Sequence, residues 1–143
     1  MKKLNFANNR IKGEGEMREL GLELARNAEA GDVIALIGDL GTGKTTLTKY
    51  IAEGLGIEGN INSPTFTIVK EYKTGRLPFY HFDVYRLGDG EELLDIGAEE
   101  FLYSGGVCVI EWADIVADVL PENAITIEIS YGETDGERNI CIS

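Results

Sequence analysis

The chain has 143 residues, 43% of them hydrophobic, and its 25 acidic and 13 basic side chains give a formal net charge of −12. This length and apolar content predict a single folded domain spanning residues 1–143 and exclude a disordered chain. The scattered cations argue against strong direct binding of nucleic acid or an anionic membrane, because phosphates are held by clustered Lys and Arg. An acidic surface is compatible with a basic protein partner, and equally with simple solubility.

Two further features bear on the compartment. No apolar run is long enough to span a bilayer, and the first residues lack the hydrophobic region of a signal peptide. Cys108 and Cys141 lie in apolar, strand-like stretches without the spacing of metal ligands. We therefore expect free thiols in a reducing compartment, and hence a cytoplasmic protein without a membrane anchor.

The first third of the chain predicts a helix followed by a buried strand. Residues 3–8 show a weak strand pattern, and residues 14–30 predict a helix that Gly31 ends. Residues 33–37 form a continuous apolar run, which is typical of a strand buried on both faces. The helix should bury one stripe of side chains, namely Met17, Leu20, Leu24 and Ala28.

The stretch from Gly38 to Thr45 matches G-x-x-x-x-G-K-[ST], the pattern of a phosphate-binding P-loop. Residues 46–55 predict the helix that follows such a loop. Lys44 is expected to reach the β- and γ-phosphates, and the Thr45 hydroxyl to ligate Mg²⁺. The expected nucleotide-binding residues are Gly41, Thr42, Gly43, Lys44, Thr45 and Thr46.

Polar residues after this helix suggest a loop that senses the nucleotide. Ser63, Pro64 and Thr65 stand where P-loop enzymes often place a switch loop, although an ordinary Ser-Pro turn is the simpler interpretation. Residues 68–73 and 77–84 then predict a β-hairpin, so the sheet should be mixed.

Two acidic residues end apolar strands and are candidates for the metal and water site. Asp83 ends the second hairpin strand, and Glu111 ends the apolar strand 107–111 in a Walker B arrangement, although strands also end in ordinary surface acids. With Lys44 they are the expected catalytic residues, and with Thr45 the expected metal ligands. His81 lies on the same strand face as Asp83, and we expect it to be structural.

The remaining segments carry weaker signals. Residues 88–101 predict an acidic helix, either a solvated face or, as the minority interpretation, a protein-docking face. Residues 114–119 predict a short helix, and residues 124–130 and 138–142 a C-terminal hairpin. The chain has no Asn-Lys-x-Asp motif for guanine, which favours an adenine nucleotide. Together the elements predict an α/β, three-layer P-loop NTPase fold with a mixed, mainly parallel central sheet and β-hairpin additions.

Four motifs in order resemble the TsaE (YjeE) family of small bacterial P-loop ATPases. They are the P-loop, then Ser-Pro-Thr-Phe from Ser63, then His-Phe-Asp-Val-Tyr-Arg from His81, and finally Glu111-Trp112. The resemblance implies a role in making N6-threonylcarbamoyladenosine at position 37 of tRNA. It also implies ATP and Mg²⁺ as cofactors, and weak ATPase activity that acts on a TsaD–TsaB complex rather than on tRNA.

The resemblance also implies roles for individual residues. Thr65 would sense the γ-phosphate, and Trp112 would pack beside the site. The adenine pocket would be built from the start of the first helix, near Ile11 to Glu14, and from the C-terminal hairpin. There the family often has an Arg soon after a glycine, whereas here Gly136 is followed by Glu137 and only then by Arg138.

Two alternatives stay open on the sequence alone. A small-molecule kinase shares the P-loop but usually needs a lid, and this short chain has no arginine-rich lid segment. A non-catalytic, nucleotide-gated adaptor would use the same site for binding alone. The sequence shows no obvious arginine finger, the cation that neutralises charge in the transition state of phosphoryl transfer. Arg86 is a candidate, and the alternative is a cation supplied by a partner.

Overall fold

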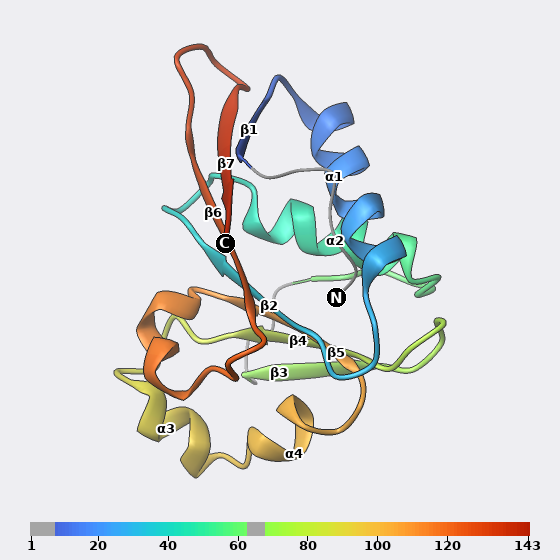
Figure 1. Ribbon diagram of the computed structural model, residues 1–143, viewed down its shortest axis with the longest axis vertical. Helices are drawn as coiled ribbons and strands as arrows, with labels where there is room; N and C mark the ends of the chain where they lie inside the picture. The colour runs from blue at the N-terminus through green and yellow to red at the C-terminus, as the bar shows by residue number, and fades with distance from the viewer. Residues whose placement is uncertain (1–7, 63–67) are drawn as a thin grey trace.

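The computed structural model describes residues 8–62 and 68–143. Its strands assemble into one seven-stranded sheet in the order β1-β7-β6-β2-β5-β4-β3 (Figure 1). The strands are β1 (Asn8–Ile11), β2 (Val33–Ile37), β3 (Val69–Tyr72), β4 (Phe79–Asp83), β5 (Val107–Glu111), β6 (Ile125–Tyr131) and β7 (Arg138–Ile142). The helices are α1 (Glu14–Asn27), α2 (Lys44–Gly54), α3 (Gly90–Asp95), α4 (Glu99–Leu102) and the 3₁₀ helix η1 (Ala113–Val119).

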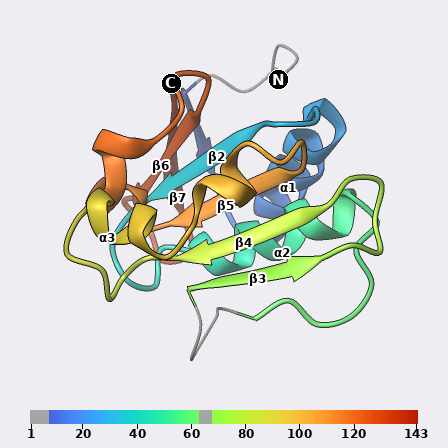
Figure 2. The same ribbon diagram turned by 90° about the horizontal axis from the view of Figure 1, so that it is seen from below.

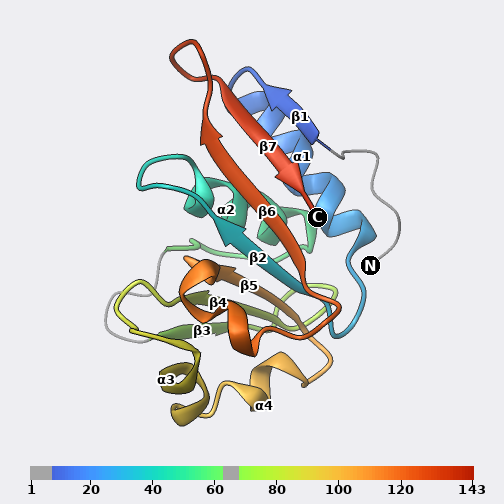
Figure 3. The same cartoon turned by 60° about the vertical axis from the view of Figure 1, so that its left-hand side comes forward.

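The sheet is mixed, as the sequence predicted. Its centre, β6-β2-β5-β4, is parallel, while β3 pairs antiparallel with β4, and β7 antiparallel with both β6 and β1. Figure 2 shows β2, β5, β4 and β3 side by side, and Figure 3 shows the β6–β7 hairpin projecting beyond the other strands. The predicted three-layer α/β architecture and both hairpins are therefore confirmed.

Each face of the sheet carries its own apolar core. Helices α1 and α2 cover one face, α1 through the first three residues of its predicted stripe and α2 through Leu47 and Ile51, while Ala28 joins the same core from just beyond the end of α1. The opposite core includes Phe82, Leu93 and Val116, from β4, α3 and η1. Alternation along β5 explains the division, since Val107 and Val109 join the first core and Cys108 and Ile110 the second.

Several predicted boundaries were wrong. The first helix ends at Asn27 rather than near Gly31, because Ala28 is extended and the Asp32 carboxylate accepts from the Glu29 amide at 2.7 Å. The strand before it is described at Asn8–Ile11, so most of the predicted range 3–8 lies outside the described residues. The acidic segment 88–101 forms two short helices, which Gly97 separates with a φ of 85°.

The described residues contain no helix that is both long and apolar enough to cross a membrane. Of the two thiols, Cys108 is buried and Cys141 exposed, and both are free. Burial raises the pKa of the Cys108 thiol to about 12. Cys108 is therefore an inert part of the core.

Candidate nucleotide-binding site

The glycine loop between β2 and α2 adopts a conformation that only glycine takes easily. Gly41 has a φ of 82° and Gly43, which caps α2, a φ of 113°. A Cβ on Gly38 would come within 2.5 Å of the Ile129 carbonyl oxygen on β6. Because α2 starts directly after the loop, its positive N-terminal end and the loop amides form an anion-binding geometry.

Lys44 supplies the positive charge of this loop. Its ammonium donates to the carbonyl oxygens of Gly38 and Asp39, at 2.5 and 2.9 Å, and lies 4.0 Å from the centre of the Trp112 ring. Burial lowers the pKa of Lys44, and the surrounding carboxylates partly oppose that effect. The charge thus lies against the loop that would hold phosphates.

Glu111, at the end of β5, joins three elements through its carboxylate. The Thr45 hydroxyl on α2 donates to Oε1 at 2.8 Å, and His81 Nε2 on β4 lies 2.5 Å from Oε2. Glu111 is only 2% exposed, and His81 is fully buried. Both carboxylate oxygens are therefore held in place, with one of them bonded to the hydroxyl expected to ligate Mg²⁺.

Asp83 stands beside Glu111 on the neighbouring parallel strand, since the two are register partners of β4 and β5. Burial raises the pKa of Asp83, while the Tyr85 amide, which donates to Oδ1 at 3.1 Å, opposes the rise. Both acids line a cavity of about 250 Å³ together with Leu40, Gly41, Gly43, Lys44, Thr45, Thr46 and Trp112. The sequence-predicted catalytic residues and metal ligands thus meet in one cavity.

The donor set of this cavity fits Mg²⁺. Among residues 8–62 and 68–143, no group of three or more His, Cys, Asp or Glu forms a complete metal site. Mg²⁺ does not require one, because it usually binds to one or two carboxylates and takes its other oxygens from water and phosphates. The Thr45 hydroxyl and the carboxylates of Asp83 and Glu111 are suitable protein ligands.

Trp112 follows Glu111 in a strained conformation. It is the only non-glycine residue among those described with a positive φ, at 63°. Left-handed backbone costs a side-chain-bearing residue about 1–2 kcal/mol and tends to cluster at functional sites. The turn places the ring between Lys44 and Tyr85, with 4.8 Å between the two aromatic centroids. Trp112 therefore packs beside the site, where the resemblance placed it.

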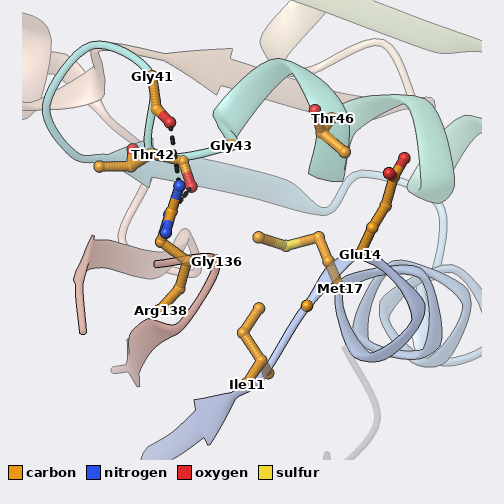
Figure 4. Close-up of a pocket in the computed structure, with 10 residues that line it drawn as sticks. Ile11, Glu14, Met17, Gly41, Thr42, Gly43, Thr46, Gly136 and Arg138 are labelled. Atoms are coloured by element: carbon orange, nitrogen blue, oxygen red, sulfur yellow. Dashed lines mark hydrogen bonds between the residues drawn. The ribbon is translucent and has the colours of Figure 1, made fainter. Parts of the chain in front are cut away.

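A second cavity of about 280 Å³ lies beside the P-loop, between the start of α1 and the C-terminal hairpin (Figure 4). Its lining residues are Ile11, Gly13, Glu14, Met17, Gly41, Thr42, Gly43, Thr46, Gly136 and Arg138. The two cavities share Gly41, Gly43 and Thr46. The start of α1 and the C-terminal hairpin thus meet beside the P-loop, in the arrangement expected of an adenine pocket.

Other predicted site residues lie elsewhere or are not described. Arg86 is exposed in the turn after β4 and is not among the described residues that line either cavity. Ser63, Pro64 and Thr65 lie outside the described residues, so the switch loop stays a prediction. The Thr42 side chain bonds to the Asp39 carbonyl at 2.8 Å, which leaves its backbone as the part that could meet a phosphate.

Sequence reasoning missed the contact between His81 and Glu111. The alternation of β4 puts His81 and Asp83 on one face, and the parallel pairing of β4 with β5 puts Glu111 on that face too. The strand pairing was the missing information, because the sequence alone does not say which strand lies beside β4. Tyr131 was also missed; its hydroxyl donates to the Leu40 carbonyl at 2.6 Å.

A buried parallel strand, a glycine loop closed by Lys44 and Thr45, and an acid on the adjacent strand define the P-loop NTPase fold. The model of the family described as "Threonylcarbamoyl adenosine biosynthesis protein TsaE" matches residues 11–140. The chain belongs to the TsaE family.

Individual relatives agree with this assignment. Two proteins named "tRNA threonylcarbamoyladenosine biosynthesis protein TsaE" are similar to the chain. The one from Bacillus subtilis is 49% identical over 87% of this chain and 77% of its own length. The one from Treponema pallidum is 48% identical over 86% of this chain and 90% of its own length. A crystal structure of YdiB from Bacillus subtilis superimposes with a TM-score of 0.81 at 39% identity, covering 98% of this chain and 86% of that one.

Proposed function

We propose that this TsaE family member is a weak, Mg²⁺-dependent ATPase that serves tRNA threonylcarbamoyladenosine biosynthesis. It would act in the cytoplasm on a TsaD–TsaB complex rather than on tRNA directly. The family description and the names of the relatives support the pathway. The net charge of −12 favours a protein partner over direct contact with tRNA.

One observation carries the proposal of hydrolysis. The Thr45 hydroxyl is bonded to the Glu111 carboxylate, and Lys44 and Asp83 line the same cavity. In P-loop NTPases a metal ion is held by the loop Ser or Thr together with an acid at the end of a neighbouring strand. Both carboxylate oxygens of Glu111 are bonded, so this group is held in one orientation, which suits the positioning of a metal ion or an attacking water.

Each of these side chains would have its own role in ATP hydrolysis. Bound Mg²⁺ would supply charge neutralisation at the β- and γ-phosphate oxygens. Lys44 would add a point charge to the same oxygens once its ammonium leaves the loop carbonyls. Glu111, fixed by Thr45 and His81, would orient either the metal or the attacking water, and Asp83 would assist from the next strand. Such catalysis consists mainly of positioning and electrostatics.

Two substitutions test the proposal against a matched control. Lys44→Ala should abolish ATP hydrolysis, whereas Lys49→Ala, which changes an exposed lysine of the same helix, should leave it unchanged. Glu111→Gln should reduce Mg²⁺-dependent turnover at least about a hundredfold, the scale of losing one preorganised catalytic group, while ATP still binds. Full ATP hydrolysis in Lys44→Ala would refute the site, and full hydrolysis in Glu111→Gln would refute the catalytic role of Glu111. Full tRNA modification by a Glu111→Gln protein that no longer hydrolyses ATP would favour the nucleotide-gated adaptor.

A further inference from the structure

The C-terminal hairpin holds the P-loop through two side chains that face each other across its strands. Tyr131 on β6 and Arg138 on β7 are register partners, and the Arg138 guanidinium lies 4.8 Å from the centre of the Tyr131 ring. The Tyr131 hydroxyl donates to the Leu40 carbonyl at 2.6 Å. Arg138 Nε donates to the Thr42 carbonyl at 3.0 Å and Nη2 to the Gly41 carbonyl at 3.5 Å (Figure 4).

These contacts set the direction of loop amides. A trans peptide is planar, and its carbonyl and amide point in opposite directions. The Leu40 carbonyl shares its peptide plane with the Gly41 amide, and the Thr42 carbonyl shares its plane with the Gly43 amide. Fixing these carbonyls toward the hairpin therefore turns the two glycine amides away from it. Backbone amides are the groups with which such loops bind phosphate oxygens.

A glycine-rich loop gains most from an external restraint. Glycine populates many backbone conformations, so a loop with three glycines among residues 38–43 has many alternatives to the binding geometry. The apparent affinity of a site falls in proportion to the fraction of molecules in the competent conformation. A side chain that holds the loop raises affinity without touching the ligand.

We infer that Tyr131 and Arg138 are positioning residues that brace the P-loop and raise its affinity for the polyphosphate part of the nucleotide. This inference rests on the proposed nucleotide-binding function and assigns the hairpin a task beyond lining a base pocket. Tyr131 gives the clearer test of the two, because it is not among the described residues that line either cavity, whereas Arg138 lines one of them.

Tyr131→Phe removes one hydroxyl and keeps the ring that Arg138 stacks on. Calorimetric titration measures the affinity for MgATP and for magnesium tripolyphosphate, which has no base. The comparison distinguishes an effect on the phosphate-binding loop, which changes both affinities, from a contact with the base, which changes only the affinity for MgATP. Losing one such hydrogen bond should weaken binding of both ligands by the same factor, about two- to tenfold. KM for ATP should rise by a similar factor, with a smaller change in kcat. Tyr103→Phe, which changes an exposed tyrosine beside α4, should alter neither affinity.

Arg138→Lys keeps the charge but loses the planar fork that reaches two carbonyls, and it should weaken both ligands as well. Unchanged affinity for both ligands in Tyr131→Phe, with the wild-type unfolding midpoint, would overturn the inference. So would a loss confined to ATP, which would place the pair at the base. A wild-type protein that binds neither ligand would instead refute the proposed function, so the two failures are distinguishable.

Discussion

The contact between His81 and Glu111 predicts a measurable coupling in stability. His81→Phe keeps an aromatic ring of similar size in the core but leaves Oε2 of a 2%-exposed carboxylate without its donor. A hydrogen bond to a charged group contributes about 1.5–3 kcal/mol, so we expect the substitution to lower the free energy of unfolding by about 2 kcal/mol. With an unfolding entropy of about 2.1 cal/mol/K per residue, a chain of 143 residues should lose about 7 °C in Tm.

A double-mutant cycle shows whether this loss comes from the contact itself. Glu111→Leu removes the carboxylate at similar volume, and in that background His81→Phe should cost less than about 1 kcal/mol, because no buried acceptor is left unpaired. Urea unfolding followed by circular dichroism measures all four proteins. An equal cost of His81→Phe in both backgrounds would show that His81 is ordinary core packing and would refute the reasoning.

Two further predictions concern packing and pH. Gly21→Ala should destabilise the protein by about 1–3 kcal/mol in urea unfolding, because the new Cβ would lie 2.4 Å from Cβ of Tyr50 on α2. A Cβ on Gly15 in the same helix would meet nothing within 4 Å, so Gly15→Ala should be neutral or stabilising by up to about 1 kcal/mol. Equal effects at both sites would contradict the close packing of Gly21 against Tyr50. Asp83→Asn should raise Tm at about pH 7, since burial raises the pKa of Asp83 and its charged form is disfavoured in the fold. That gain should shrink as the pH falls through the raised pKa towards the ordinary value of 3.8, where the wild-type carboxyl is itself protonated; a gain that grows at acid pH would show the opposite sign.

The part of the fold that the sequence predicts best is the part fixed by local patterns. The apolar run at β2, the glycine loop and the strand ending in Glu111 all lie where their patterns placed them. Each combines a hydrophobic period with a specific turn or chemical requirement, so few alternatives compete. The prediction of one helix over residues 88–101 was wrong because Gly97, in the left-handed conformation, interrupts a segment of otherwise helical composition.

The contacts that complete the site depend on pairing between distant strands. His81 meets Glu111 only because β4 lies beside β5, and Tyr131 meets Leu40 only because β6 lies beside β2. Hydrophobic periodicity gives each strand its faces but not its neighbours, so neither contact could be predicted from the sequence.

The central claim is tested most directly by the ATPase rate of this protein alone and with purified TsaD and TsaB, with and without tRNA. The account predicts a low rate alone, strong stimulation by the two proteins, and loss of the stimulated rate in Lys44→Ala. Intact ATP binding with no stimulation by TsaD and TsaB would contradict the partner assignment, and no ATP binding at all would contradict the site.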